Sequence, residues 1–274
     1  MKFFIAFVLA STFICSASFA QANTVYERVI KSGTLKCGYI PYPPALIIDP
    51  NTGEKSGIFY EFMNEVAKRL SLKVEWVQET GWGTFINDLR TDRFDAVCSA
   101  IWVNAARARE ADHTKPLYYS GIGAWVRADD DRFNNDLSLL NHKDFTIATI
   151  DGEAASIIAK SDFPKATLFS LPELSSVSDM ALSVSTGKAD ITFLENYIAQ
   201  GFLKSNPNTL QRVKGDIRVY GNSVHIKKGE HDLRLMLNSA IEEVANSSLV
   251  EDLFIKYDVP AGSYFMPAKP YKGR

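Results

Sequence analysis

The sequence predicts an α/β fold built from two similar lobes, each a mostly parallel sheet flanked by helices. Strand-like and helix-like segments alternate along the chain, which is typical of parallel sheets with helices on both faces. One short pattern occurs twice: a turn, a basic residue and an aspartate open an apolar strand at 91–95 and again at 186–190. Two extended apolar stretches, 121–126 and 217–226, could cross between the lobes. A single sheet with an accidental repeat is the alternative that this spacing leaves open.

A helix is the clearest element in the first half of the chain. It begins at Gly57, and its apolar residues from Phe59 to Leu70 recur at spacings that form one continuous face. The other predicted elements of this half are strands at 34–38, 74–77 and 94–99 and a short helix at 85–89. In the second half, the same rhythm predicts strands at 146–150, 167–171 and 189–194 and helices at 154–160, 177–184, 233–244 and 249–257.

Residues 1–22 have the pattern of a secretory signal peptide. A positive start and an apolar run that ends at Cys15 lead to an A-x-A cleavage signal at 20–22. The run is shorter than the roughly 20 residues that a membrane span needs. The residue before Cys15 is large, whereas a lipoprotein would have a small one there, so we expect no lipid anchor. We predict cleavage before Asn23 (before Gln21 is nearly as good) and a periplasmic location.

The composition excludes several classes of protein. With 46% hydrophobic residues, 23% charged residues and a formal net charge of −2, the chain is neither collagenous nor disordered. A chain this close to neutral has no electrostatic footprint for nucleic acid or an anionic membrane surface. It contains no G-x-S-x-G, H-E-x-x-H, Walker A, G-x-G-x-x-G or C-x-x-C motif, which argues against the commonest hydrolases, zinc enzymes and nucleotide enzymes. We therefore expect no metal ion and no cofactor.

The histidines and cysteines give weaker signals. The four histidines lack metal-ligand spacing, and we expect each on the solvated surface: His113, His142, His225 and His231. After the predicted cleavage, only Cys37 and Cys98 remain, both in apolar strand-like runs. In an oxidising compartment they can form a disulfide, but two buried thiols fit the sequence equally well. The sequence leaves this pairing open.

Two charged residues follow the strands of the repeated pattern. Arg107 comes after the strand at 94–99, and Glu195 directly follows the strand at 189–194. Ligands of open α/β sheets bind at the carboxyl ends of the strands. An arginine fork can hold a carboxylate and an acid can hold an ammonium, so the pair would suit an α-amino acid. Taken alone, Arg107 is more simply a helix-surface residue and Glu195 an acid favoured by a helix dipole.

The order and spacing of several motifs resemble family 3 of the extracellular solute-binding proteins, the periplasmic receptors of polar amino-acid ABC importers. The motifs are the opening strand at 33–38, the aromatic-proline turn at 41–44, the helix start at 57–62 and an ungapped stretch from Asp95 through Arg107 and Asp112 to Tyr118. The resemblance covers essentially the whole mature chain. It implies the two-lobed type II periplasmic binding protein fold with two hinge crossings. We place one lobe at 23–125 and 221–274 and the other at 126–220.

The resemblance also implies roles for individual residues around the ligand backbone. Arg107 matches the arginine that binds the ligand α-carboxylate. Glu195 matches the acid, usually an aspartate, that binds the α-ammonium. Ala100 and Trp102 match positions that contribute backbone groups, although Trp102 stands where the family usually has threonine or serine.

Other positions correspond to the side-chain pocket and to the second lobe. Tyr42 and Trp82 match aromatic residues of the pocket, and Tyr39 stands where several relatives have an acid. Gly152-Glu153-Ala154 matches a G-T-T turn whose amides and hydroxyls meet the carboxylate, but both hydroxyls are absent here. Each lost donor is worth about 0.5–1.5 kcal/mol net. Glu153 would add a negative charge near the carboxylate.

Four aromatic residues would then surround the cleft: Tyr39, Tyr42, Trp82 and Trp102. Such walls favour an aromatic, apolar or cationic ligand through stacking and cation–π contacts. The alternative is that two of the four simply fill the core. The identity of the ligand therefore stays open.

We predict a receptor without catalytic activity, which captures a small amino acid or a related amine or carboxylate. It would close by hinge rotation as a monomer and deliver the ligand to an ABC permease in the inner membrane. One alternative is an enzyme on the same scaffold that resembles cyclohexadienyl dehydratases and acts on prephenate or arogenate. Glu153 or Glu195 would then act as the acid if burial raised its pKa. A third possibility, the sensing half of a peptidoglycan-cleaving enzyme, is disfavoured because no catalytic domain follows Arg274.

Overall fold

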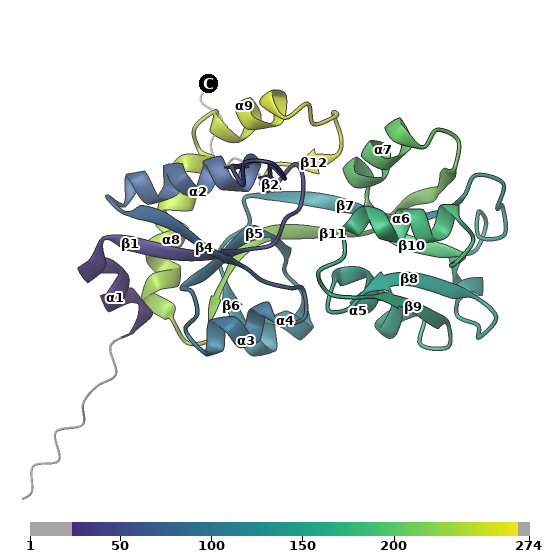
Figure 1. Cartoon of the computed structure of the whole chain (residues 1–274), viewed down its shortest axis with the longest axis horizontal. Helices are drawn as coiled ribbons and strands as arrows, with labels where there is room; N and C mark the ends of the chain where they lie inside the picture. Colours follow the sequence, from purple (N-terminus) through teal and green to yellow (C-terminus); the bar gives the residue numbers. More distant parts are fainter. Residues whose placement is uncertain (1–23, 268–274) are drawn as a thin grey trace, which may run out of the picture.

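Two lobes lie side by side in the computed structural model, which describes residues 24–267 (Figure 1). One lobe contains the beginning of the described chain together with its last helices, and the other contains the middle of the chain. Two long strands, β7 (Tyr118–Arg127) and β11 (Leu210–Lys227), run from one lobe into the other. They contain the two extended stretches that the sequence predicted as crossings. The predicted signal peptide at 1–22 lies outside the described residues.

The first lobe is formed mainly by the N-terminal part of the described chain. It contains α1 (Val25–Ser32), β1 (Thr34–Tyr39), β2 (Ile47–Ile48), β3 (Lys55–Ser56), α2 (Ile58–Arg69), β4 (Lys73–Glu79), α3 (Phe85–Arg90), β5 (Ala96–Trp102), α4 (Ala105–Glu110) and β6 (Ala111–His113). After β11 the chain returns to it as α8 (His231–Ala245), α9 (Leu249–Lys256) and β12 (Tyr264–Phe265). All the elements that periodicity predicted here are confirmed. Those it missed, such as α1 and α4, have at most 8 residues, too few for a clear period.

The second lobe repeats the alternation of strand and helix. It contains a 3-10 helix η1 (Leu137–Leu140), β8 (Thr146–Ile150), α5 (Ala154–Asp162), β9 (Thr167–Leu171), α6 (Val177–Ser185), β10 (Ile191–Glu195) and α7 (Asn196–Ser205). The predicted strands and helices are again confirmed, and only η1 and α7 were not expected.

Parallel pairing dominates within each lobe, as predicted. β1 pairs in parallel with β4 and β5, and β8 pairs in parallel with β9 and β10. The crossing strands are antiparallel to each other, and they join β5 on one side to β10 on the other. The ladder is therefore continuous, in the order β4-β1-β5-β11-β7-β10-β8-β9. The lobe boundaries that we predicted at 125/126 and 220/221 fall inside β7 and β11, so they stay a prediction.

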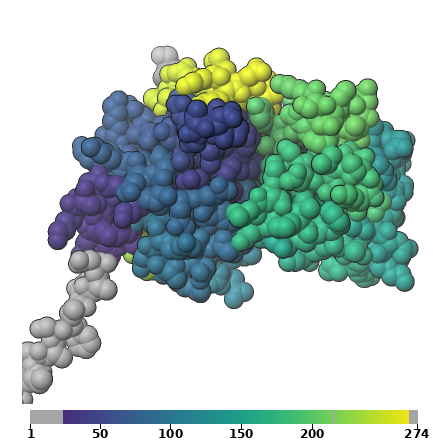
Figure 2. All heavy atoms as spheres, viewed as in Figure 1, coloured from purple at the N-terminus to yellow at the C-terminus, as the bar shows by residue number. Residues whose placement is uncertain are grey.

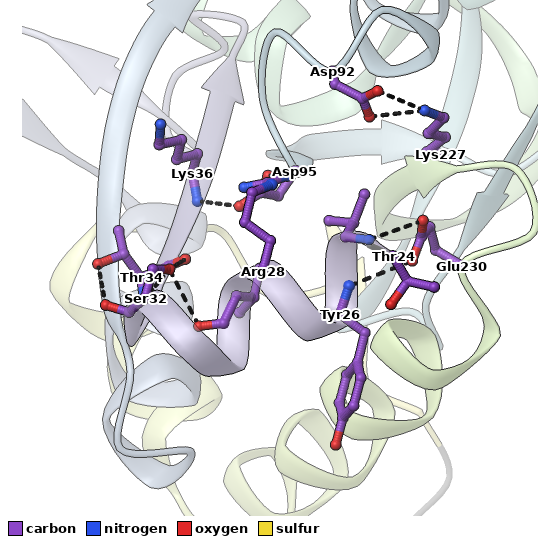
Figure 3. Close-up of polar contacts among 12 residues, drawn as sticks. Thr24, Tyr26, Arg28, Ser32, Thr34, Lys36, Asp92, Asp95, Lys227 and Glu230 are labelled. Carbon is purple, nitrogen blue, oxygen red and sulfur yellow. Dashed lines mark hydrogen bonds and ion pairs between the residues drawn. The ribbon is translucent and has the colours of Figure 1, made fainter. Parts of the chain in front are cut away.

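The repeated sequence pattern has the same structural role in both lobes. Asp95 N donates to the Lys36 carbonyl over 2.8 Å, and Lys36 N donates to Asp95 Oδ2 over 2.9 Å. Asp190 and Thr146 exchange the same two bonds, each of 2.8 Å. Each aspartate thus fixes the start of two neighbouring parallel strands. In the first lobe, Asp95 also forms an ion pair with Arg28 of α1 (Figure 3).

Helix α1 is held to the first lobe at its N-terminus. Thr24 and Glu27 form a capping box, and the carboxylate of Glu230 accepts from the amides of Val25 and Tyr26 over 3.1 and 3.4 Å (Figure 3). A negative charge at this end of a helix is favourable because it accepts hydrogen bonds from amides that have no partner in the helix. It also interacts favourably with the positive end of the helix dipole.

A disulfide joins Cys37 of β1 to Cys98 of β5. The two Cα atoms are 5.5 Å apart, the residues are 61 positions apart in the sequence, and neither side chain is exposed. The sequence left open whether these cysteines pair, and the structure shows that they do. The crosslink joins two neighbouring strands of the first lobe, one of which, β5, ends at Trp102.

Candidate ligand-binding site

A narrow cavity, too tight in this form to admit a water molecule, lies between the two lobes. Its walls are Tyr42, Trp82, Ala100, Trp102, Arg107 and Glu153, all of which are at most 5% exposed. The first five belong to the first lobe, and Glu153 precedes α5 in the second. The space-filling view shows the two lobes in contact along their shared boundary (Figure 2). The structure is therefore a closed form with a small internal space.

Arg107 is the one cation among the described residues that line this cavity. It follows Asn104, whose side chain caps α4 by accepting from Arg107 N over 3.0 Å. The guanidinium donates from Nη1 to the Trp102 carbonyl and from Nη2 to the Gly152 carbonyl, each over 3.0 Å. The second bond crosses from one lobe to the other. Arg107 is 3% exposed, so the simpler interpretation of a surface arginine is wrong, and burial lowers its pKa to about 10.

The facing turn of the second lobe comes very close to the first lobe. Gly152 has φ of +75°, and a Cβ atom there would be 2.5 Å from the backbone N of Gly83. A side chain is therefore excluded both by the left-handed backbone and by the closed lobes. Gly83 N in turn donates to Glu173 Oε2 over 3.2 Å, a second hydrogen bond between the lobes.

Glu153 is a buried acid at the start of α5. Its side chain caps the helix by accepting from Ala155 N over 2.6 Å. Burial raises the pKa of this carboxyl, and the Ala155 amide and the nearby charge of Arg107 oppose that rise. No ion pair joins Glu153 and Arg107 within residues 24–267, although each influences the ionisation of the other.

Glu195 lies outside the cavity wall, at the junction of β10 and α7. Its Oε1 accepts from Ser120 Oγ over 2.6 Å and from Trp102 Nε1 over 3.0 Å, and its Oε2 accepts from the Tyr264 hydroxyl over 3.2 Å. All three donors are neutral. Burial is the main cause that raises the pKa of Glu195 to about 7, and the three donors moderate that rise.

The predicted aromatic residues divide into two groups. Tyr42 and Trp82 pack edge to face with their ring centroids 5.7 Å apart, and together with Trp102 they form the apolar wall of the cavity. Tyr39 is not part of that wall, because its ring packs against Trp76 at 6.4 Å and lies under the Lys55 ammonium at 4.7 Å.

Six of the ten residues predicted for the site therefore line one cavity, and four do not: Tyr39, Gly152, Ala154 and Glu195. Gly152 still contributes its carbonyl to Arg107. Ala154 is fully buried as the first residue of α5. A role of these residues in ligand binding stays a prediction. Sequence reasoning missed Ser120, Tyr264 and Phe85, whose ring lies 5.6 Å from the Arg107 guanidinium, because no local pattern marks them.

The prediction for one histidine is wrong. His225 of β11 is fully buried, with its ring 5.6 Å from Phe85 and 5.9 Å from His113. Burial lowers its pKa to about 3, so it is neutral. At this position β11 pairs with β5 and β6, and residues 222–226 are all buried, so neither face of the strand meets solvent here.

Between residues 24 and 267, no group of three or more potential metal ligands is arranged to hold an ion. No helix in that range has the length and apolar character needed to cross a membrane.

The raised pKa of Glu195 predicts how stability depends on pH. The folded state keeps a proton up to about pH 7, whereas the unfolded chain releases it near the ordinary glutamate pKa of 4.5. This group therefore lowers the free energy of unfolding as pH rises from 4.5 to 7, by about 1.4 kcal/mol per pH unit. Glu195→Gln should remove that contribution, which urea unfolding at several pH values would measure.

The exposed Glu75 provides a control for this measurement. The stability of Glu75→Gln should follow that of the wild type across the same range. The explanation fails if the difference in unfolding free energy between wild type and Glu195→Gln is the same at pH 5 and pH 7.

Residues 35–259 match the bacterial extracellular solute-binding proteins, family 3. The chain belongs to this family. This confirms the resemblance that the motif order indicated, and the two-lobed fold agrees with it.

Relatives of this solute-binding chain are distant but cover most of its length. It is 24% identical to a protein of Haemophilus influenzae named a probable amino-acid ABC transporter-binding protein, over 89% of this chain and 92% of that protein. It is 23% identical to the L-cystine-binding protein TcyA of Bacillus subtilis, over 87% and 86% of the two chains. A probable histidine-binding protein of Campylobacter jejuni is 24% identical, over 94% and 99%.

Solved structures establish the same fold. A solute receptor for L-cysteine of Neisseria gonorrhoeae has a TM-score of 0.75 at 19% identity, over 89% of this chain and all of that one. An ancestral amino acid-binding protein, described as a precursor of cyclohexadienyl dehydratase, has a TM-score of 0.73 at 24% identity, over 86% and 99%.

Proposed function

We propose that this solute-binding chain captures a small amino acid or a related amine or carboxylate between its lobes and delivers it to an ABC importer. The observation that carries the proposal is Arg107, a buried cation that lines the cavity between the lobes. Among residues 24–267, its guanidinium hydrogen-bonds only the carbonyls of Trp102 and Gly152. An arginine has five N–H donors in a fixed fork, so the remaining donors are available to a carboxylate. The names of the relatives support an amino-acid ligand.

We also propose a cellular location, a partner and an oligomeric state for the chain. The predicted signal peptide and the disulfide between Cys37 and Cys98 support a periplasmic location, because disulfides persist in oxidising compartments. The names of the relatives support an ABC transporter as the partner, with its permease in the inner membrane. We propose a monomer whose second lobe moves about β7 and β11, since only these crossing strands pass directly between the lobes within residues 24–267.

A thermal-shift screen tests this function. The purified chain would be heated with L-histidine, L-cystine, L-arginine, L-phenylalanine and 4-aminobutyrate, each compared with a buffer control. A compound present at 100 times its Kd stabilises the folded state by about 2.7 kcal/mol, which gives a clear rise in Tm. At least one amino acid or related compound should produce it. No rise across this panel would contradict the proposed function.

An enzyme on the same scaffold is a second candidate, and one observation favours it. Burial raises the pKa of both Glu153 and Glu195, as an acid that donates a proton near neutral pH requires. Of the two, only Glu153 lines the cavity. Incubation with prephenate and arogenate separates the candidates. Stoichiometric binding without turnover supports the receptor, whereas sustained release of product supports the enzyme.

A further inference from the structure

The cavity contains two buried charges of opposite sign that no side chain pairs. Within residues 24–267, the Arg107 guanidinium forms no ion pair with an acid, and no side-chain donor bonds the carboxylate of Glu153. Arg107 extends from α4 of the first lobe, and Glu153 begins α5 of the second. Burial lowers the pKa of Arg107 and raises that of Glu153, so in each case it disfavours the charged form. Buried charges without partners are costly.

Glu195 has a different environment, although it corresponds to the acid expected to bind an ammonium. Three neutral donors already bond its two oxygens, from Ser120, Trp102 and Tyr264. The Trp102 indole both lines the cavity and donates to Glu195, so the ring occupies a place that a ligand donor would need. Ser120 is also fixed, because its Oγ accepts from Asn222 Nδ2 over 2.9 Å. A ligand ammonium would have to displace this network.

We propose that Glu153, rather than Glu195, binds the positively charged group of the ligand, while Arg107 binds its carboxylate. This assignment rests on the proposed function and specifies its ligand class: a small zwitterion whose two charged groups bridge the lobes. The ligand then compensates each buried charge, and it also connects α4 of one lobe to α5 of the other. The closing of the two lobes and the pairing of both buried charges with the ligand therefore occur in the same step.

The remaining walls fit an organic cation beside Glu153. Tyr42, Trp82 and Trp102 present aromatic rings to the same space, and ring faces attract ammonium groups within about 6 Å. In this form the space between these walls is too narrow to admit even a water molecule, so ligand entry requires the two lobes to move apart.

Matched probes test the assignment. The first set contains two zwitterions, 4-aminobutyrate and L-2-aminobutyrate. It also contains butyrate, which is the deaminated form of both, and n-propylamine, which is the decarboxylated form of both. The second set is L-phenylalanine, 3-phenylpropionate and 2-phenylethylamine. Calorimetric titration measures each Kd for wild type, Glu153→Gln, Glu195→Gln and the exposed control Glu75→Gln. Circular dichroism and thermal unfolding show whether each variant is folded.

We expect the wild type to bind a zwitterion more tightly than its deaminated form. Glu153→Gln should weaken the binding of that zwitterion by about 30-fold or more and leave the deaminated form within about 3-fold. Its effect should exceed that of Glu195→Gln, and Glu75→Gln should match the wild type. If Glu153→Gln does not fold, Glu195→Gln still tests the assignment. Zwitterion binding by Glu195→Gln within about 3-fold of the wild type supports Glu153, and a loss of about 30-fold or more overturns the assignment.

Three results would overturn the assignment while the proposed function stands. The first is that the wild type binds a zwitterion and its deaminated form with equal affinity. The second is that Glu195→Gln loses more affinity for the zwitterion than Glu153→Gln does, and the third is that Glu153→Gln binds the zwitterion as tightly as the wild type. If the wild type binds no member of either set, the same comparison is made with the amino acid that gave the largest thermal shift and with its deaminated form. If no compound of the thermal-shift screen gave a shift either, the proposed function is contradicted and the assignment falls with it.

Discussion

Replacing Arg107 with alanine should weaken the binding of a carboxylate ligand by about 2–5 kcal/mol, which is a rise in Kd of roughly 30-fold to several thousand-fold. The variant removes the cation that points into the cavity and leaves the ligand carboxylate buried without a partner. It also removes the hydrogen bond to the Gly152 carbonyl that joins the lobes. Calorimetric titration with the amino acid that gives the largest thermal shift measures this loss.

Two further variants separate binding from folding. Arg109→Ala changes an exposed residue of the same helix and should bind as the wild type does. Arg107→Lys keeps the charge but loses the planar fork, so its affinity should lie between those of the wild type and Arg107→Ala. Wild-type affinity in a folded Arg107→Ala variant would show that the carboxylate binds elsewhere.

Much of the fold could be predicted because the same short sequence pattern precedes a buried strand in each lobe. The aspartates at 95 and 190 each open an apolar strand. In the structure each forms two hydrogen bonds with one residue of the neighbouring strand, one through its backbone amide and one through its carboxylate. Such a local arrangement can be predicted from a few adjacent residues. Helix α4 could not be predicted in this way, because its 6 residues include only one buried side chain, that of Arg107.

The candidate site was less accessible to sequence reasoning, and the reason is distance along the chain. Arg107 and Trp82 could be placed because the spacing of the surrounding motifs resembles that of the family. The partners of Glu195 could not, since Ser120 and Tyr264 are 75 and 69 positions away and lie in no pattern. Tyr39 was expected at the cleft, but its ring packs against Trp76 and lies under Lys55. Only the folded chain shows which side of a strand end faces a ligand.

Breaking the disulfide between Cys37 and Cys98 should destabilise the folded chain by about 4 kcal/mol. The bond closes a loop over 61 positions, and the entropy that it removes from the unfolded chain corresponds to that amount. Guanidinium unfolding of oxidised and reduced wild type measures the difference directly, because both forms keep the two sulfur atoms in the core. The midpoint of unfolding should fall on reduction, and the slope should rise because the unfolded chain without the crosslink exposes more surface.

The double variant Cys37→Ala, Cys98→Ala is the matched control for the reductant. It lacks the crosslink, so its unfolding midpoint should be the same with and without dithiothreitol. It should also be somewhat less stable than the reduced wild type, because removing two fully buried sulfur atoms leaves unfilled space in the core. Equal stability of oxidised and reduced wild type, with both thiols titrated after reduction, would show that packing between β1 and β5 holds this part of the first lobe without the covalent bond.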